Sequence, residues 1–471
     1  MKTTIERYLE SLRGKRAAVI GIGVSNTPLV RMLLRADVLV TACDKNPREE
    51  FGPLADELES LGAALKLGPD YLKDLGRQDV VFRTPGMHPE TPELVEAAAR
   101  GAEITSEMEV FFRVCPCRII GVTGSDGKTT TSTIIARLLE KAGHTVYLGG
   151  NIGKPLLPNV AAMLETDLAV VELSSFQLMT MRESPDIAVV TNVAPNHLDI
   201  HKSMGEYIAA KENIYLHQSA VGKLVYNLDN GITRGFAVKA PGRAVPFSRH
   251  EQTEAGVFLD DGIICRSRGG ETEPVLPLED ILLPGDHNVE NYMAAIAAVE
   301  GLVPDDVVRA FAASFGGVEH RIELVRKCCG VRYYNDSIGT SPTRTIAGLR
   351  SFPEKVVLIA GGYDKHIPFD GLGEEIVKHV RLLVLNGATA DAIRLAVEKA
   401  PGYGEGTPDI LQFEGFRQAV QAAVEMAIPG DVVLLSPACA AFDQFKNFAV
   451  RGEAFKKMIY QLEESREEED F

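Results

Sequence analysis

Short apolar runs alternate with longer amphipathic stretches along most of this 471-residue chain. RAAVIGIG at 16–23 and DLAVVEL at 167–173 have the length and β-branched content of buried strands. TTSTIIARLLEKAG at 130–143 carries apolar residues at helical spacing and ends at Gly143, a residue type common just after a helix. Repeated alternation of this kind predicts an α/β fold with mainly parallel, doubly wound sheets.

The alternation falls into three blocks, which is the number of domains expected at roughly 150 residues each. We predict domains over residues 1–104, 105–317 and 318–471. The first and third blocks predict Rossmann-like domains. In the second block the glycine-rich loop GSDGKT at 124–129 follows an apolar run, which predicts a central P-loop ATPase-type domain. A polar, glycine-rich stretch over roughly 230–275 predicts an insertion or hairpin region on the central domain.

Polar residues gather where the predicted strands end. Because ligands bind at the carboxyl ends of strands in doubly wound sheets, these positions are the first candidates for a site. They are Asp44, Gly124–Thr129, Glu172, Asn192, Asp336 and Lys365.

One of these strand ends carries the glycine-rich loop GVTGSDGKTTT. Gly124 and Gly127 let backbone N–H groups turn inward, and the N-terminus of the following helix adds the positive end of its dipole. Lys128 can neutralise charge on the β- and γ-phosphates, and Thr129 can place a hydroxyl on Mg²⁺. Although Val122 breaks the standard GxxxxGK spacing, we predict a nucleoside triphosphate site rather than a structural turn.

A lysine lies on an apolar helix face downstream of this loop. Ser203 and Glu206 have the spacing of a capping box, which predicts the start of a helix. The face that follows is formed by Tyr207, Lys211, Ile214 and Tyr215. A lysine among apolar neighbours is costly unless it snorkels to water, pairs or is modified, and the pattern alone favours snorkelling.

Two further side chains are candidates for a metal site. Glu172 ends the predicted strand DLAVVEL, where its carboxylate is well placed to reach the metal of the phosphate loop. His197 lies in NVAPNHLDIH, just beyond another strand end, and could also be a ligand. A lone histidine is more often an ordinary loop residue, so this position stays open on the pattern alone.

The net charge of −16 argues against broad binding to nucleic acid or to a membrane surface. Anionic ligands must then be held by local features such as amide groups, lysines and metal ions. None of the seven cysteines forms a CxxC pair, so we expect reduced thiols. The charged N-terminus is unlike a signal peptide, and no apolar run reaches transmembrane length. We expect a cytoplasmic monomer.

Together these motifs resemble the Mur ligases, ATP-dependent amide-forming enzymes of peptidoglycan precursor synthesis. The resemblance covers essentially the whole chain. It rests on TGSDGKTT, ELSSFQL, NHLD, Lys211, GDHNVEN and EHRIE. LGGNIG at 148–153 and SPACAAFDQFKNF at 436–448 are most similar to the members that add D-glutamate to UDP-N-acetylmuramoyl-L-alanine.

The resemblance implies that the first domain binds the UDP-substrate and not a dinucleotide. Its turn, Gly21-Ile22-Gly23, lacks the third glycine of a dinucleotide fingerprint. The implied UDP-substrate residues are Val24, Ser25, Asp44, Lys45, Thr84, Pro85, Gly86 and Asn151.

For ATP, the resemblance implies the phosphate loop together with residues for the adenine, a phosphate and the ribose. These are Gly124, Ser125, Asp126, Gly127, Lys128, Thr129 and Thr130 in the loop, Asn288 and Asn291 at the adenine, Arg321 at a phosphate and Asp336 at the ribose. The implied pocket for the incoming amino acid is Thr340, Lys365, Phe442 and Phe448 in the C-terminal domain.

Two Mg²⁺ ions and a carbamylated lysine, formed from CO₂, are also implied. The metal ligands would be Thr129, Glu172, His197 and Lys211 as its carbamate, and the catalytic residues Lys128, His197 and Lys211. The reaction implied runs through an acyl phosphate that the amino acid's amine attacks. Two positions depart from the family pattern near the amino-acid pocket, since Ile338 replaces a lysine and Ala441 a serine.

Three other functions remain as alternatives. A sibling ligase, adding another amino acid, or a folylpolyglutamate synthetase would differ in the substrates that trigger phosphate release. A P-loop switch protein would hydrolyse nucleotide slowly without a second substrate. An NAD-dependent oxidoreductase would rest only on the Gly21-Ile22-Gly23 turn and Asp44.

Overall fold

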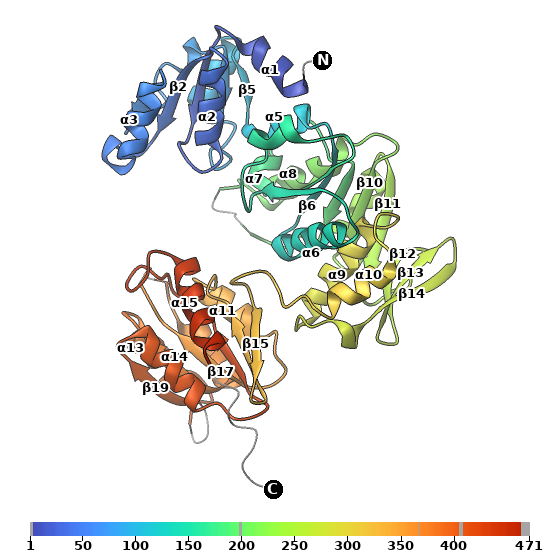
Figure 1. The fold of residues 1–471 in the computed structure, drawn as a ribbon, viewed down its shortest axis with the longest axis vertical. Helices are drawn as coiled ribbons and strands as arrows, with labels where there is room; N and C mark the ends of the chain where they lie inside the picture. Colours follow the sequence, from blue (N-terminus) through green and yellow to red (C-terminus); the bar gives the residue numbers. More distant parts are fainter. Residues whose placement is uncertain (1–2, 197–199, 366, 405–407, 463–471) are drawn as a thin grey trace. The chain divides into compact units, whose positions relative to one another are not determined.

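The computed structural model describes residues 3–196, 200–365, 367–404 and 408–462 (Figure 1). The chain falls into two compact units. The first comprises Met1–Asp280 and Glu290–Phe311, and the second comprises Ile281–Val289 and Ala312–Phe471. The first unit contains two sheets and the second contains one.

The N-terminal sheet is parallel throughout and has the strand order β3-β2-β1-β4-β5. Its strands are β1 (Arg16–Ile20), β2 (Leu39–Asp44), β3 (Ala64–Leu67), β4 (Val80–Phe82) and β5 (Glu103–Thr105). The helices of this region are α1 (Thr4–Leu12), α2 (Asn26–Arg35), α3 (Pro53–Ser60), α4 (Pro92–Ala99) and α5 (Glu107–Val114), with 3₁₀ turns η1 (Arg48–Glu50) and η2 (Leu75–Arg77). The strand order reverses between β1 and β4, which is where such sheets bind ligands.

The central sheet has nine strands in the order β14-β13-β12-β11-β10-β9-β6-β8-β7. They are β6 (Arg118–Thr123), β7 (Val146–Gly150), β8 (Leu168–Glu172), β9 (Ile187–Val190), β10 (Lys223–Asn227), β11 (Arg243–Ser248), β12 (Ala255–Asp260), β13 (Ile263–Arg268) and β14 (Glu271–Pro277). The helices here are α6 (Lys128–Lys141), α7 (Ser175–Leu178), α8 (Met204–Leu216), α9 (Asp286–Ala298) and α10 (Asp305–Ala312), with 3₁₀ helices η3 (Leu157–Ala162), η4 (Thr233–Lys239) and η5 (Leu278–Asp280).

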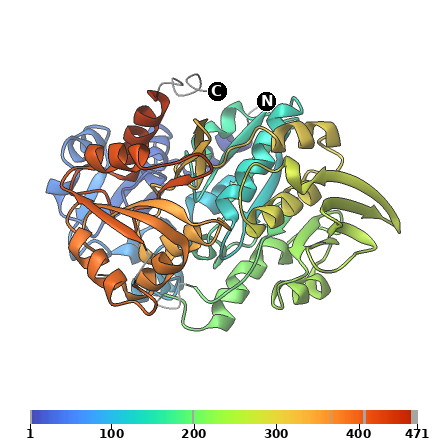
Figure 2. The same ribbon diagram turned by 90° about the horizontal axis from the view of Figure 1, so that it is seen from below.

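The hairpin region expected over 230–275 is shorter in the structure. Strands β12, β13 and β14 form an antiparallel ribbon at one end of the central sheet (Figures 1 and 2). The preceding residues form η4 and β11, and β11 pairs in parallel with β10. The polar composition therefore located the ribbon but placed its start too early.

The C-terminal sheet has the order β15-β16-β20-β17-β18-β19, parallel except for the edge hairpin β15–β16. Its strands are β15 (Glu323–Cys328), β16 (Val331–Asn335), β17 (Val356–Ala360), β18 (Val380–Asn386), β19 (Asp409–Phe413) and β20 (Val432–Leu435). Its helices are α11 (Pro342–Leu349), α12 (Asp370–His379), α13 (Ala390–Glu398), α14 (Phe416–Glu425) and α15 (Phe448–Tyr460).

Alternate residues of β17 enter different apolar clusters. Val356 and Leu358 belong to one cluster, and Val357 and Ile359 belong to the other. Because successive side chains of a strand point to opposite faces, this sheet is buried on both. The prediction of mainly parallel, doubly wound α/β sheets is confirmed. No helix among the described residues combines the length and apolar character that crossing a bilayer requires.

Candidate functional site

Two glycines shape the loop between β6 and α6. Gly127 is the N-cap of α6 with φ +79°, and Gly124 also has positive φ. A Cβ on Gly127 would collide with the Asn291 side chain, and one on Gly124 would collide with the Thr191 hydroxyl. Glycine is therefore required at both positions, for conformation and for space.

The loop is held against the segment that follows β9. The Ser125 N–H donates to the carbonyl of Asn192 at 2.9 Å, and the Asp126 N–H donates to the Asn192 side chain at 3.0 Å. The Thr191 hydroxyl donates to the Asp126 carbonyl at 2.6 Å. Asn192, noted in the sequence only as a polar strand end, thus fixes the shape of the phosphate-type loop.

Lys128 folds back over the same loop. Its Nζ donates to the carbonyls of Gly124 and Ser125, both at 2.9 Å. A cation placed at a glycine loop and a helix N-terminus is well arranged to bind phosphate oxygens.

Lys211 on α8 is buried, with only 1% of its surface exposed. Its Nζ donates to the Gly124 carbonyl at 2.8 Å and lies 4.7 Å from the centre of the Tyr207 ring. The expectation from the pattern alone, that this lysine snorkels to water, is therefore wrong. Burial, and next the charge of Lys128, lower the pKa of Lys211 well below its ordinary value, while Asp126 opposes the shift.

The helix that carries Lys211 begins as predicted. The Ser203 hydroxyl accepts the Glu206 N–H at 3.2 Å, as expected of an N-cap. The Glu206 carboxylate, however, accepts the N–H of Lys202 at 2.6 Å, so the capping box is not closed on Ser203.

Glu172 ends β8 opposite Val122 of β6, beside the start of the loop. It is 1% exposed. One carboxylate oxygen accepts from Asn151 Nδ2 at 2.8 Å, and the other, Oε2, is buried without a hydrogen-bond partner among the described residues. An unpaired buried carboxylate oxygen is costly, and a hard cation would satisfy it.

The unpaired Glu172 oxygen therefore suits a Mg²⁺ ion, and Thr129, expected as a further ligand, is the second residue of α6. Asn151, expected at the UDP-substrate, donates to the Glu172 carboxylate, so a UDP-substrate candidate and a metal candidate are in direct contact. His197, the further predicted ligand, lies outside the described residues.

The first domain brings its predicted residues to the carboxyl edge of β1, β2 and β4. Asp44 accepts the N–H groups of Ile22 and Asn46 at 2.8 and 3.0 Å, so it orders the Gly21 turn itself. Val24 is 78% exposed in this turn. The other members at this edge are Ser25, Lys45, Thr84, Pro85 and Gly86, of which Lys45 and Gly86 are exposed.

Sequence reasoning missed Arg83, which directly precedes Thr84 and is 1% exposed. Its guanidinium donates both to the carbonyl of nearby Met87 and to the carbonyl of Phe176, which lies 93 residues further along the chain. An arginine ending the apolar strand VVF, just before a Thr-Pro-Gly turn, is the signal that could have identified it.

Of the two predicted adenine residues, Asn291 reaches the loop. Its Oδ1 accepts the Thr131 hydroxyl at 3.0 Å, next to Thr130 of the loop. Asn288 belongs to the second unit, where its side chain donates to the Pro284 carbonyl at 2.7 Å.

In the second unit, Asp336 follows β16 and is buried. It accepts the Ser436 hydroxyl at 2.7 Å and the Ile322 N–H, next to Arg321, at 3.3 Å. Burial raises the pKa of Asp336 to about 7, although the Ser436 hydrogen bond and the charge of Arg321 lower it. The candidate ribose and phosphate residues thus share one cluster.

The predicted amino-acid residues also lie in this unit. Lys365 Nζ donates to the Thr340 carbonyl at 3.1 Å. Phe442 is 64% exposed and packs edge-on against Tyr363, with ring centres 5.8 Å apart. Phe448 begins α15, and its carbonyl accepts the Ser337 hydroxyl at 2.7 Å. Three contacts therefore involve these residues: the two hydrogen bonds and the one aromatic pair.

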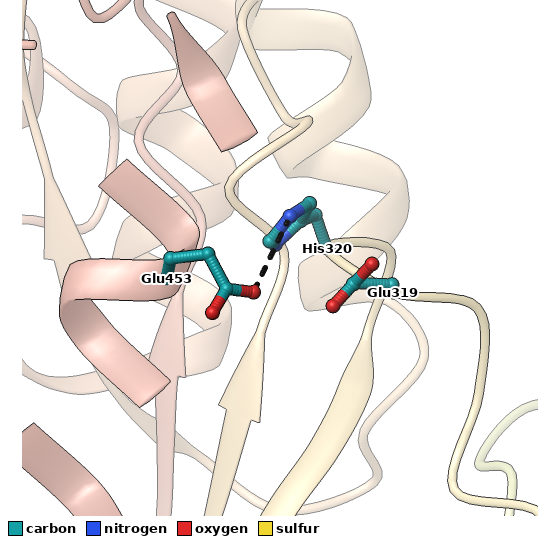
Figure 3. Close-up of side chains that lie close together, drawn as sticks. All are labelled: Glu319, His320 and Glu453. Atoms are coloured by element: carbon teal, nitrogen blue, oxygen red, sulfur yellow. Dashed lines mark ion pairs between the residues drawn. The ribbon is translucent and has the colours of Figure 1, made fainter. Parts of the chain in front are cut away.

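A separate group, Glu319, His320 and Glu453, brings three potential metal-ligating atoms within 4.8 Å of one another (Figure 3). The Lys456 ammonium lies 2.6 Å from Glu319 and 3.2 Å from Glu453, and 3.1 Å from Glu323. These carboxylates already neutralise a lysine, so the group is an ion-pair network.

The chain matches three family profiles in order. Residues 15–106 match the N-terminal domain described as Mur ligase MurD-like, residues 122–299 match the Mur ligase middle domain, and residues 320–439 match the Mur ligase glutamate ligase domain.

Curated relatives match over nearly the whole length. The UDP-N-acetylmuramoylalanine--D-glutamate ligase of Acetivibrio thermocellus is 50% identical over 467 residues, covering 98% of this chain and 100% of the relative. The enzyme of the same name from Clostridium novyi is 48% identical over 464 residues, with the same coverage.

Among solved structures, the UDP-N-acetylmuramate-alanine ligase of Thermotoga maritima superposes with a TM-score of 0.57 at 17% identity, covering 95% of this chain and 99% of that one. The MurF ligase of the same organism, in complex with ADP, gives 0.54 at 17% identity, covering 98% and 100%. These two likenesses show the shared fold, whereas the family profiles and curated relatives show the family. This chain therefore belongs to the Mur ligase family.

Proposed function

We propose that this chain adds D-glutamate to UDP-N-acetylmuramoyl-L-alanine with hydrolysis of ATP to ADP and phosphate, in peptidoglycan precursor synthesis. Mur ligases are ATP-dependent, Mg²⁺-using ligases, and relatives that are 50% and 48% identical over 98% of the chain carry the name of this reaction. The observation that carries the chemistry is the convergence of Lys128 and Lys211 on the Gly124 carbonyl, beside buried Glu172.

Amide formation from a carboxylate requires that one carboxylate oxygen first be converted into a better leaving group, here phosphate. The substrate carboxylate attacks the γ-phosphorus, an O–P bond forms, and ADP leaves. The amine of D-glutamate then attacks the acyl carbon, loses a proton and expels phosphate. Two anions must approach in the first step, so the loop N–H groups and Lys128 stabilise the charge that develops on the transferred group.

Thr129 and Glu172 would hold Mg²⁺, and the unpaired Glu172 Oε2 supports that assignment. Bound there, the ion would neutralise phosphate charge. By family resemblance, His197 and carbamylated Lys211 would serve a second ion. The low pKa of Lys211 supports the carbamate, because only a neutral amine reacts with CO₂.

The groups proposed for the uridine diphosphate lie in the first compact unit, whereas Asp336, Arg321 and the amino-acid residues lie in the second. The Gly21 turn and the Thr84–Gly86 loop would hold the uridine diphosphate, and Asp336 with Arg321 would hold the nucleotide of ATP. Lys365, close to Thr340, would pair with the side-chain carboxylate of the amino acid. A cytoplasmic, monomeric enzyme without nucleic-acid or membrane partners remains part of the proposal.

The test is phosphate release from ATP with Mg²⁺ and UDP-N-acetylmuramoyl-L-alanine, screened with D-glutamate, L-glutamate, D-glutamine, L-lysine and diaminopimelate. We expect release and a ligated product only with D-glutamate. Preference for another amino acid would identify a sibling ligase instead. Release that needs no amino acid would remove the ligase assignment.

A further inference from the structure

Arg83 lies between the first domain and the central domain inside the first unit. It follows β4, and its side chain is among the largest fully buried side chains of the described residues. A buried guanidinium is costly unless its N–H groups are satisfied, so its partners reveal what it holds together.

On one side, Nη1 of Arg83 donates hydrogen bonds to carbonyls of the loop that follows β4. It donates to the Met87 carbonyl at 2.9 Å, and at longer range to the carbonyls of Thr84 at 3.4 Å and Pro85 at 3.3 Å. Three carbonyls around one nitrogen fix the curvature of this loop, which is the loop assigned above to the uridine diphosphate.

On the other side, Nη2 donates to the Phe176 carbonyl and to the Thr180 hydroxyl, both at 2.9 Å. Phe176 lies on α7, which starts three residues after Glu172. One planar group therefore joins the candidate UDP loop to the segment that continues from the candidate metal carboxylate.

The contacts continue from α7 to the phosphate loop. His201 stacks on Phe176 with ring centres 5.3 Å apart, and its Nε2 lies 2.9 Å from the Ser175 hydroxyl. The His201 ring packs edge-on against Tyr207 at 5.1 Å, and the Tyr207 hydroxyl lies 2.9 Å from that of Ser125. Rigid aromatic packing thus links the Arg83 contacts with the loop that carries Lys128.

Glu109 on α5 acts on Arg83 at longer range: burial lowers the pKa of Arg83, and the charge of Glu109 opposes that shift. This carboxyl is also buried; burial raises its pKa, while the Ser106 hydrogen bond, then the charge of Arg83 and, less strongly, the Thr180 side chain act in the opposite direction. Arg83 is therefore a charged group that hydrogen-bonds mainly to main-chain carbonyls. Hydrogen bonds to main-chain carbonyls of two segments hold the backbones of those segments in a fixed relative position.

We propose that Arg83 is a positioning residue that sets the Thr84–Gly86 loop relative to the phosphate loop, so that the substrate carboxylate meets the γ-phosphate in line. This inference rests on the proposed function. A misplacement of about 1 Å between reacting groups can cost on the order of 10²-fold in rate, so a clamp of this kind affects turnover without touching substrate.

The test compares Arg83→Met with Arg266→Met in the full chain. Arg266, in the antiparallel ribbon, is also buried and pairs with Asp305 at 2.7 Å, so its loss controls for removing a buried arginine. For Arg83→Met we expect kcat to fall about 10- to 100-fold and the KM for UDP-N-acetylmuramoyl-L-alanine to rise several-fold. The affinity for a non-hydrolysable ATP analogue should stay within about twofold, and Arg266→Met should change only the melting temperature.

Two milder variants keep the test valid if Arg83→Met does not fold. Thr180→Val removes one Arg83 hydrogen bond and should lower kcat and raise the same KM by a smaller factor. Arg83→Lys should recover part of the loss. If Thr180→Val and a folded Arg83 variant match the wild type in kcat and KM, or resemble Arg266→Met, the positioning role is overturned. Absence of wild-type ligation would instead overturn the proposed function.

Discussion

At the scale of single residues, two lysines approach one oxygen. Lys128 and Lys211 donate to the Gly124 carbonyl at 2.9 and 2.8 Å. Lys211 is the more buried of the two, and burial, followed by the charge of Lys128, lowers its pKa well below the ordinary value. The roles proposed for the two lysines therefore differ: Lys128 would bind phosphate, and Lys211 would react with CO₂ as a neutral amine.

We expect Lys128→Ala to lower kcat at least 100-fold, because removing a preorganised charge from a transferring group costs about 3 kcal/mol or more. The circular dichroism spectrum should not change, since this side chain is only half-buried at the start of α6. Lys141→Ala, at the exposed end of the same helix, is the matched control and should keep full activity. Near wild-type turnover in Lys128→Ala would remove the phosphate-loop assignment.

Lys211→Ala should lose activity that acetate or formate partly restores. A small carboxylate carries the charge and the oxygens of a carbamate, which Mg²⁺ prefers, and could enter the space left by the side chain. Lys211→Arg should be inactive, because arginine stays cationic. Carbon-13 bicarbonate should label the wild type, with a carbamate signal in the NMR spectrum. A fully active Lys211→Ala, or an unlabelled wild type with Mg²⁺ bound, would contradict the carbamate.

At the scale of elements, the loop between β6 and α6 depends on Gly127. Replacement by alanine places a Cβ at φ +79°, which costs about 1 kcal/mol, and drives it into the Asn291 side chain. Gly143→Ala is the matched control, since it has φ +91° at the other end of α6 with open space around it. Both variants should lose similar backbone stability, but only Gly127→Ala should lose ATP-analogue binding in calorimetry. If both variants bound the ATP analogue equally well, the close approach of Gly127 to the Asn291 side chain would not be needed for nucleotide binding.

Elements with local signals could be predicted from the sequence, and contacts between distant segments could not. The glycine loop, α6 and the apolar face of α8 follow from spacing within a few residues. The direction of the Lys211 side chain could not be predicted in this way, because spacing shows which helix face a lysine occupies but not which polar group lies opposite that face. The role of Arg83 was missed for the same reason, since its partners Phe176 on α7 and Thr180 just after α7 lie more than ninety residues away in the sequence.

At the scale of the whole molecule, each compact unit buries a carboxyl group. Glu107 on α5 is in the first unit, where it accepts the Leu157 N–H at 3.4 Å, and Asp336 is in the second. Burial raises both pKa values to about 7. Ion pairs with exposed partners act in the other direction: Arg350 and then Lys378 lower the pKa of Glu375 to about 2. The two kinds of group therefore make opposite contributions to the pH dependence of stability.

The sign of the buried contribution follows from proton binding. Between pH about 4 and 7 the folded state keeps the Asp336 proton that the unfolded state has lost, so the free energy of unfolding falls as pH rises, by up to about 1.4 kcal/mol per pH unit. Asp336→Asn keeps the shape and cannot ionise, so it should raise the melting temperature most at pH 8, less at pH 5, and have little effect at or below pH about 4. Glu375→Gln should instead destabilise at pH 7 and lose its effect as the pH falls toward 2. Calorimetry at these pH values would contradict the account if Asp336→Asn were more stabilising at pH 5 than at pH 8.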